Sequence, residues 1–329
     1  MSGPADGEPV AVVGAGVIGA AWAARFALHG HPVRVVDPAP TAGRVLEAVL
    51  ANACRAWDEL GLVSRPAPVD LVASVGEAVD GVIHVQESAP EDPDVKRAVL
   101  AEIDVHAPAG VVIASSTSGL RPSLLQAGLR HPERLVVGHP FNPVYLMPLV
   151  EVCAGELTDP AAVHTAMATY RSVSMHPLHV RVEIDAFIAD RLMEALWREA
   201  LWLIEDGVAT TAEIDEAMTF GFGLRWAQMG LFETYRIAGG EGGMAHFLRQ
   251  FGPALAWPWS RLTDVPDLDD ELVATIARQE AERSDGADVR ELERRRDRNL
   301  VALLRALEST GAGAGSLLAE QRRRLARSG

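Results

Sequence analysis

The chain has 329 residues, of which 48% are hydrophobic, and it carries a formal net charge of −15 at pH 7. This length corresponds to about two domains of roughly 150 residues each. The acidic charge excludes a nucleic-acid partner and an anionic membrane surface, because both are normally met by clustered Lys and Arg.

The N-terminal segment MSGPADGEPV has neither the basic region nor the apolar core of a targeting signal. No apolar run in the sequence approaches the roughly 18 residues that span a bilayer. The two cysteines offer no disulfide framework, and neither cysteines nor histidines follow the spacing of a metal site. We therefore expect a cytoplasmic protein without a bound metal.

The first predicted elements are a strand, a tight turn, a helix and a second strand, which together cover residues 10–40. Glycines in the turn let the backbone approach a pyrophosphate and let the helix pack close to the strand, and the helix N-terminus then binds the phosphates. The acid that ends the second strand accepts hydrogen bonds from the adenosine ribose and repels a 2′-phosphate, which indicates NAD rather than NADP. The predicted cofactor residues are Gly14, Ala15, Gly16, Val17, Ile18, Gly19 and Asp37.

The next segments keep the alternation of strand and helix. Residues 81–108 read as a strand and then a helix, and residues 110–120 read as a strand that ends in the polar turn SSTSGL. This pattern predicts an α/β fold with a Rossmann-type, doubly wound parallel sheet. Past about residue 183 only long helical stretches follow. We therefore expect an NAD-binding domain at 1–183, an all-helical second domain at 184–310 and a flexible basic tail at 311–329.

The segment GHPFNPVYLMPLVEV, residues 138–152, sets His139 twelve positions before Glu151. Three prolines lie between the two residues and prevent a continuous helix, so their side chains meet only if the chain turns back. The residues around each of the two have the pattern of a short strand. Adjacent strand ends would therefore bring the histidine and the glutamate together.

These motifs resemble those of the 3-hydroxyacyl-CoA dehydrogenases over roughly residues 9–240. In that family a serine in a turn like SSTSGL lies twenty-one positions before the histidine of an HxFNP segment, and a glutamate follows twelve residues later. Ser118, His139 and Glu151 match this spacing. The resemblance implies an NAD-dependent dehydrogenase in which His139 is the general base, Glu151 orients it, and Ser118 binds the substrate oxygen.

The resemblance also implies further parts of the enzyme. The family places a glutamate and a lysine, five residues apart, near the nicotinamide ribose, and Glu91 and Lys96 have that spacing. Lys96 is the single lysine of the sequence. The helical domain of the family mediates dimerisation, so a homodimer through residues 184–310 is expected.

Residue 190 departs from the family pattern. The family has an asparagine in a segment like GFxxNRL, whereas this sequence reads DAFIADRL with Asp190 at that place. An amide can donate a hydrogen bond to a thioester carbonyl, but an ionised carboxylate only accepts and suits a cation. Helical spacing puts Glu194 and Trp197 on the same face as Asp190, so two acids and an indole could converge there. The alternative is a helix with an apolar stripe and two solvated acids.

The sequence offers few partners for the phosphates of coenzyme A, since residues 41–62 contain only Arg44 and Arg55 as basic residues. Residues 221–244 also differ from the PMGPFEL type of the acyl-CoA enzymes. An arginine there could bind a free carboxylate, and rings could enclose a quaternary ammonium through cation–π contacts of about 0.5–2 kcal/mol each. The predicted substrate-binding residues of this segment are Arg225, Trp226, Phe232 and Tyr235.

The motifs predict a small zwitterion as substrate, and the resemblance implies NAD-dependent oxidation of its 3-hydroxyl group. One alternative is another 3-hydroxy acid dehydrogenase of the superfamily, acting on L-gulonate or on a 3-hydroxyacyl-CoA, which would have no use for a cation-binding acid. The other is a non-catalytic NAD-binding protein of the crystallin type. The intact set of Ser118, His139 and Glu151 argues against that second alternative.

Overall fold

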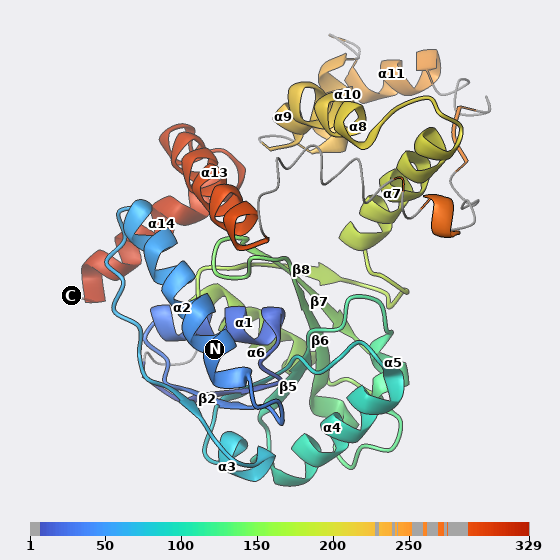
Figure 1. Cartoon of the computed structure of the whole chain (residues 1–329). Coiled ribbons are helices and arrows are strands. Elements are labelled where there is room, and N and C mark those ends of the chain that lie inside the picture. The colour runs from blue at the N-terminus through green and yellow to red at the C-terminus, as the bar shows by residue number, and fades with distance from the viewer. Residues whose placement is uncertain are drawn as a thin grey trace. The chain divides into compact units, whose positions relative to one another are not determined.

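The computed structural model describes residues 7–227, 230–238, 241, 243–251, 259–261, 269–272, 275 and 289–328. The chain divides into two compact units (Figure 1). Unit 1 comprises residues 1–190, 294–306 and 317–329, and unit 2 comprises residues 191–293 and 307–316. Parts of the predicted helical domain, such as residues 252–258 and 262–268, lie outside the described residues.

Unit 1 is built on an eight-stranded sheet with the order β3-β2-β1-β4-β5-β6-β7-β8 (Figure 1). The strands are β1 Val10–Val13, β2 Val33–Val36, β3 Val69–Leu71, β4 His84–Glu87, β5 Val112–Ser115, β6 Leu135–Pro140, β7 Leu149–Ala154 and β8 His176–Val180. The first six strands pair in parallel, and their order is that of a dinucleotide-binding fold. The predicted doubly wound sheet is thereby confirmed. β7 runs antiparallel to β6 and parallel to β8, so two reversed strands complete one edge.

Helices connect the strands of unit 1. They are α1 Val17–Leu28, α2 Ala42–Glu59, α3 Val75–Val79, α4 Pro93–His106, α5 Pro122–Gln126, the 3-10 turn η1 Pro132–Arg134 and α6 Pro160–Ser172. Local sequence sets where two of them start. Asp92 caps α4 by accepting two backbone N–H groups of the first turn, Asp159 caps α6 by accepting one, and a proline follows each cap. Proline suits that position because its missing N–H has no helical partner there.

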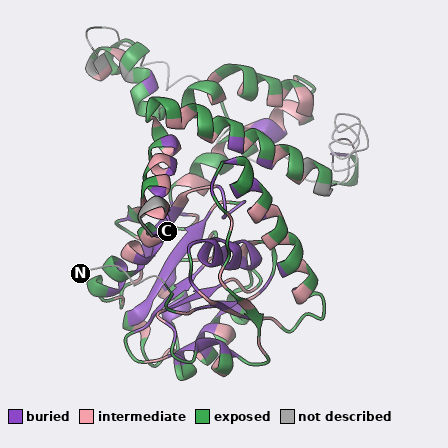
Figure 2. Cartoon of the chain, turned by 90° about the vertical axis from the view of Figure 1, so that its left-hand side faces the viewer, coloured by how far each residue is buried: buried purple, intermediate pink, exposed green. Residues whose placement is uncertain are grey.

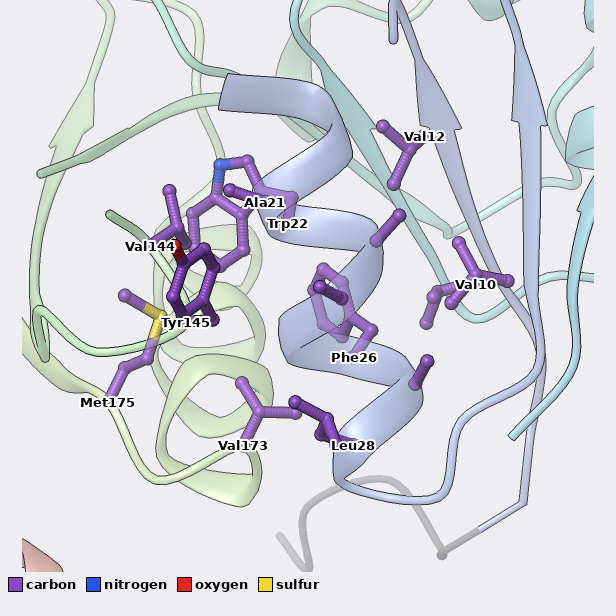
Figure 3. Packing of buried hydrophobic residues seen from close by; sticks show 14 of the residues in the cluster. Val10, Val12, Ala21, Trp22, Phe26, Leu28, Val144, Tyr145, Val173 and Met175 are labelled. Carbon is purple, nitrogen blue, oxygen red and sulfur yellow. The ribbon is translucent and has the colours of Figure 1, made fainter. Parts of the chain in front are cut away.

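Hydrophobic residues pack on both faces of the sheet. Successive side chains of a strand point to opposite faces, so Val10 and Val12 join the cluster under α1 and α2, while Ala11 and Val13 join the cluster under α3 and α4. In the larger cluster Trp22 and Phe26 of α1 stack with ring centroids 5.5 Å apart (Figure 3). The central strands are correspondingly coloured as buried in Figure 2. This double-sided core supports the strand ends that carry polar side chains.

The C-terminal region differs from the sequence-based expectation. The flexible tail expected at 311–329 is wrong, because helix α14 spans Gly313–Ser328 and follows α13, Val289–Thr310. Val301 of α13 and Leu318 of α14 are buried in the larger core cluster of unit 1. Arg322 donates hydrogen bonds to the carbonyls of Leu60 and Gly61 at the end of α2. Apolar residues at helical spacing and arginine–carbonyl contacts thus hold this segment on the sheet domain.

Unit 2 is helical in its described part, as predicted, and no strand occurs there. Its helices are α7 Ala189–Glu205, which begins in unit 1, then α8 Thr211–Glu216, the π-helical turn η2 Ala217–Phe222, α9 Gly223–Trp226, α10 Leu231–Ala238 and α11 Gly243–Phe251. α8 starts with a capping box, in which Thr210 and Glu213 satisfy each other's backbone N–H groups. No helix in the described ranges is both long and apolar enough to cross a membrane.

Candidate active site

The reversal of direction between β6 and β7 brings a histidine and a glutamate together. His139 lies directly opposite Glu151 in the register of the two strands. The His139 Nδ1 and Glu151 Oε2 atoms are 3.0 Å apart, and both side chains are buried. An ionised carboxylate only accepts hydrogen bonds, so Nδ1 carries the proton of the neutral ring and Nε2 keeps its lone pair. Such a ring is ready to accept a proton at Nε2.

The second oxygen of Glu151 binds the start of helix α7. Its Oε1 atom accepts hydrogen bonds from the backbone N–H groups of Ile188 and Ala189, each at 3.0 Å. N–H groups at the beginning of a helix have no partner within the helix, and they favour a negative charge. Glu151 therefore fixes both the ring of His139 and the first turn of α7.

Asp190 lies in this first turn, next to the histidine. Its Oδ2 atom is 3.6 Å from His139 Nε2, and its side chain is 19% exposed. The imidazole ring is thus placed between two carboxylates, with Glu151 at Nδ1 and Asp190 at Nε2. This arrangement is built entirely within unit 1.

The residues just before α7 have a strained backbone that the sequence gives no sign of. Ala186 and Phe187 have φ angles of 60° and 49°, in the left-handed region that residues other than glycine rarely adopt. Phe187 is buried, and its ring centroid lies 5.6 Å from that of His139. The backbone N–H of Ala186 donates to the carbonyl of Gly119 at 3.2 Å. Residue propensity and periodicity do not predict a left-handed backbone at an alanine. Sequence reasoning therefore missed the contribution of this loop to the site.

Ser118 lies in the turn after β5, and Glu91 organises that turn. One oxygen of Glu91 accepts hydrogen bonds from the Thr117 hydroxyl at 2.5 Å and from the backbone N–H groups of Ser118 and Gly119 at 3.0 and 3.2 Å. Burial alone would raise the pKa of Glu91, but the Thr117 hydrogen bond, the charge of Lys96 and the two backbone donors outweigh it and lower the pKa. Glu91 therefore stays ionised and holds the turn.

Lys96 is almost fully buried on α4. Its Nζ atom lies 3.0 Å from Glu87 Oε1, 3.0 Å from the Ala89 carbonyl oxygen and 3.4 Å from Glu91 Oε2. Glu87, at the end of β4, is a further buried acid that sequence reasoning missed. An acid at the end of the strand pattern GVIHVQE was the available signal.

The glycine turn has the sterics that a dinucleotide site needs. A Cβ on Gly14 would lie 2.4 Å from the Ser88 carbonyl oxygen, and one on Gly19 would lie 1.8 Å from the Gly14 carbonyl oxygen. A Cβ on Gly16 would meet no protein atom within 4 Å, so this position faces open space at the start of α1. The residues present therefore fit a pyrophosphate held at that helix N-terminus.

Asp37 follows β2 and turns towards the glycine turn. Its carboxylate accepts hydrogen bonds from the backbone N–H of Ala15 at 2.6 Å and of Ala39 at 2.7 Å. A cavity of about 400 Å³ within unit 1 joins this corner to the histidine. The predicted residues that line it are Gly16, Val17, Ile18, Asp37, Glu91, Lys96, Ser118 and His139.

The other predicted substrate residues lie in unit 2. Glu194 and Trp197 are on α7, Arg225 and Trp226 on α9, and Phe232 and Tyr235 on α10. Three of them already have partners there: Glu194 pairs with Arg198 at 3.6 Å, Trp226 contacts the ring of Phe222, and Tyr235 stacks on Phe247. Their convergence on the substrate stays a prediction.

Hydride transfer to a nicotinamide requires a bound dinucleotide and a base for the hydroxyl proton, and the cavity of unit 1 is lined by residues suited to both. The chain is an NAD-dependent dehydrogenase. It belongs to the 3-hydroxyacyl-CoA dehydrogenase family: the model of that family's NAD binding domain matches residues 9–184, and the model of its C-terminal domain matches residues 187–269.

Individual relatives narrow the comparison. The chain is 50% identical over 324 residues to the L-carnitine dehydrogenase of Mesorhizobium japonicum, covering 96% of this chain and 89% of that protein. It is 52% identical over 323 residues to the L-carnitine dehydrogenase/betainyl-CoA thioesterase of Agrobacterium fabrum, covering 97% of this chain and 66% of that longer protein. A solved structure of FHMPC 5-dehydrogenase, an NAD+ dependent dismutase, matches with a TM-score of 0.77 and 29% identity over 92% of this chain and 99% of that one.

Proposed function

We propose that the chain oxidises the 3-hydroxyl group of L-carnitine to 3-dehydrocarnitine with NAD. The observation that carries the proposal is the carboxylate of Asp190, 3.6 Å from His139 Nε2, at the place where the acyl-CoA enzymes have an amide. The identity of about half of all residues to L-carnitine dehydrogenases supports the same substrate.

In the proposed reaction His139 Nε2 accepts the proton of the 3-hydroxyl group, while the hydrogen on C3 leaves as hydride. NAD, when bound, accepts that hydride. Glu151 stabilises the imidazolium that forms, because its Oε2 atom already accepts a hydrogen bond from Nδ1. The Ser118 hydroxyl donates a hydrogen bond to the substrate oxygen and keeps it in reach of the base. Ser118 and His139 line the cavity of unit 1, and Glu151 lies behind His139 in the same unit.

Asp190 is proposed to act as the countercharge of the quaternary ammonium. In carnitine the nitrogen is two bonds from C3, so a carboxylate beside the base lies near the cation as well as near the reacting hydroxyl. Glu194 and Trp197, farther along α7, and the rings of Trp226, Phe232 and Tyr235 are proposed to enclose the methyl groups. Arg225 is proposed to bind the substrate carboxylate.

A panel of hydroxy acids separates the proposal from its alternatives. The purified chain would be assayed with NAD and L-carnitine, L-gulonate or 3-hydroxybutyryl-CoA, with NADH absorbance as the readout. We expect kcat/KM to be largest for L-carnitine. A larger value for either of the other two would assign the enzyme to that substrate, and no turnover with any of them would favour the crystallin-like alternative.

We also propose a homodimer formed through the helices of unit 2. Large apolar side chains in the described part of this unit are exposed, among them Phe220 at 81% and Phe232 at 74%. Exposed large apolar side chains are available for protein–protein contacts, and a second copy of the chain is the proposed partner. Sedimentation equilibrium should give a dimer that Phe220→Asp weakens. The matched change in unit 1, Val63→Asp at a residue also exposed, should leave the mass unchanged.

A further inference from the structure

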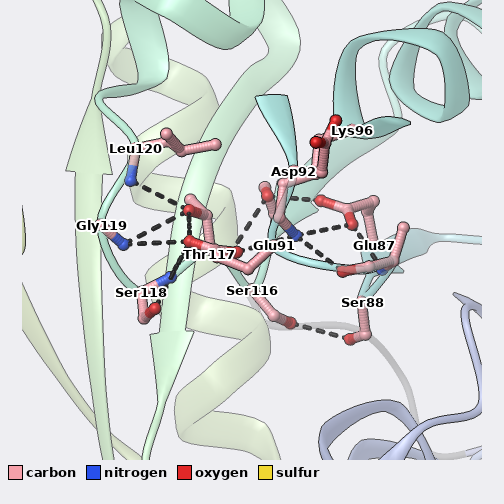
Figure 4. A network of polar contacts seen from close by, with 12 residues as sticks. Glu87, Ser88, Glu91, Asp92, Lys96, Ser116, Thr117, Ser118, Gly119 and Leu120 are labelled. Atoms are coloured by element: carbon pink, nitrogen blue, oxygen red, sulfur yellow. Dashed lines mark hydrogen bonds and ion pairs between the residues drawn. The ribbon is translucent and has the colours of Figure 1, made fainter. Parts of the chain in front are cut away.

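Three charged side chains from three consecutive segments meet behind the turn that carries Ser118 (Figure 4). They are Glu87 at the end of β4, Glu91 in the following loop and Lys96 on α4. Lys96 is 1% exposed and Glu87 is fully buried. A buried charge is costly unless it is paired and hydrogen-bonded, so this cluster has to satisfy its own charges.

The ammonium group of Lys96 is saturated inside the protein. An ammonium has three N–H donors. Glu87 Oε1, the Ala89 carbonyl oxygen and Glu91 Oε2 lie 3.0, 3.0 and 3.4 Å from Nζ and match those three donors. A ligand in the cavity would have to displace one of these oxygens to bind Lys96.

Glu87 connects the ends of two neighbouring strands. Its Oε1 atom accepts a hydrogen bond from the backbone N–H of Ala89 at 2.6 Å, besides that from Lys96. Its Oε2 atom accepts one from the hydroxyl of Ser115, the last residue of β5. The Ser115 oxygen in turn accepts from the backbone N–H of Thr117 at 3.3 Å. Glu87 therefore supports the serine turn at the point where that turn leaves the sheet.

Glu91 supports the same turn from its other side. Its Oε1 atom binds donors of Thr117, Ser118 and Gly119, while its Oε2 atom faces Lys96 (Figure 4). Glu91 is partly exposed, so without Lys96 its position would be fixed on one side only. Lys96 thus contacts both of the acids that hold the turn, Glu87 and Glu91.

We propose that Glu87 and Lys96 are positioning residues for Ser118. Their buried ion pair fixes Glu91, and Glu91 fixes the turn that presents the Ser118 hydroxyl to the substrate oxygen. Lys96 then acts inside the protein, in contrast to the direct cofactor contact expected from the family resemblance. The inference rests on the proposed role of Ser118 in the dehydrogenase reaction.

A double-mutant cycle between Lys96 and Ser118 tests this coupling in the full chain. Lys96→Met should lower kcat with L-carnitine at saturating NAD by about 10- to 100-fold, the scale expected when a reacting group is held in the wrong place. In the Ser118→Ala background the same change should have little further effect, because the hydroxyl to be positioned is gone. A loss through general destabilisation would be equal in both backgrounds and would overturn the inference.

The affinity for NAD separates positioning from direct cofactor binding. Isothermal titration of NAD into Lys96→Met should give a Kd within about 3-fold of the parent, whereas a Kd raised 10-fold or more would make Lys96 a cofactor ligand. Arg97→Met is the matched control, because this neighbour on α4 is half exposed, pairs at the surface with Asp94 and donates to the carbonyl of Pro93 in its own helix. The control should change neither kcat nor Kd.

A charge-balanced variant keeps the test decisive if Lys96→Met does not fold, since that change leaves Glu87 buried without its cation. Glu87→Gln combined with Lys96→Met removes both charges of the pair. The combined variant should bind NAD like the parent and show its loss of kcat only when Ser118 is present. Ser118→Ala with parental kcat would instead overturn the proposed role of Ser118 and this inference together. An impaired Ser118→Ala with additive losses would overturn the inference alone.

Discussion

The two units of the chain differ in where their large apolar side chains lie. In unit 1 the bulkiest ones, such as Trp22, Trp57 and Tyr170, are buried around the sheet. In the described part of unit 2, Phe220 and Phe232 are mostly exposed, and few residues are buried. A core that is complete within one unit can hold reacting groups rigidly, whereas exposed helix faces are available to a partner or a substrate. We therefore propose that unit 1 carries out the proton and hydride chemistry and that unit 2 selects the substrate and mediates assembly.

The same contrast appears among the candidate site residues. His139 and Glu151 are each fixed by hydrogen bonds that cross between strands or reach the start of α7. Among the described aromatic residues, Trp226 contacts the ring of Phe222 alone and Tyr235 that of Phe247 alone. Changes to the first group should therefore abolish the reaction, and changes to the second should alter which substrate is accepted.

The largest effect should come from the base itself. His139→Gln removes the group that accepts the hydroxyl proton, and we expect kcat to fall by about 10²- to 10⁴-fold. Binding of NAD, measured by titration, should be nearly unchanged because the glycine turn is intact. His131→Gln, at an exposed histidine of unit 1, serves as the control and should leave kcat at the parental value. Near-parental turnover of His139→Gln would show that His139 is not the general base.

Stability should show that the C-terminal helix is part of unit 1. Leu318→Ala removes a side chain buried in the larger core cluster, and we expect the free energy of unfolding to fall by about 2–4 kcal/mol. Leu303→Ala on α13 is the control, since that side chain is half exposed and should change the free energy by about 0.5 kcal/mol or less. Urea denaturation measures both. A loss in Leu318→Ala as small as that of the control would mean that this side chain of α14 does not stabilise the core.

Asp190 is the last residue of the first segment of unit 1, and it tests where substrate selection begins. Asp190→Asn keeps the shape of the side chain but removes the proposed countercharge of the ammonium. We expect kcat/KM for L-carnitine to fall by about 10- to 100-fold. A 3-hydroxy acid without the ammonium should lose much less, and this double comparison isolates the charge from damage to the fold. Asp185→Asn, at an exposed acid in the loop that precedes α7, is the control. Equal losses on both substrates would make Asp190 a catalytic or structural residue instead.

The cofactor preference should depend on unit 1 alone. Asp37 is proposed to face the adenosine ribose, so the enzyme should prefer NAD strongly over NADP. Asp37→Ala should lower the ratio of kcat/KM with NAD to kcat/KM with NADP by about 10-fold, mainly because kcat/KM with NAD falls. Asp58→Ala, at an acid on α2 that bonds Ser64, should leave the ratio unchanged. An unaltered ratio in Asp37→Ala would show that another residue binds the adenosine ribose.

The smallest effect concerns the strained loop before α7. Ala186→Gly should raise the free energy of unfolding by about 0.5–1 kcal/mol, because glycine adopts the left-handed conformation without strain. Ala189→Gly, at the first residue of α7, should lower it, since glycine is a poor helix former. Thermal unfolding followed by circular dichroism would register the two opposite signs. A loss of stability in Ala186→Gly would mean that the loop is not strained.

Short-range chemistry explains why much of unit 1 could be predicted from the sequence. Gly14 has a φ of 101°, and a Cβ on Gly19 would clash with the Gly14 carbonyl, so the local backbone requires both glycines. The strand and helix patterns of residues 10–40 likewise depend on local spacing. The helix starts at Asp92 and Asp159 follow from side chains that bond the next backbone groups. Even the meeting of His139 and Glu151 required only that the chain turn back between two short strands.

Tertiary structure decided the features that join segments far apart in the chain. The pairing of Glu87 with Lys96 and Ser115, the left-handed backbone at Ala186, and the docking of α14 on the core could not be read from the residues in order. Each depends on a hydrogen bond or a buried contact whose partner comes into place only when the sheet and its covering helices have formed. A sequence pattern reports the preference of a residue for its own backbone, whereas the position of a charged group is set by the oxygen atoms that folding places around it.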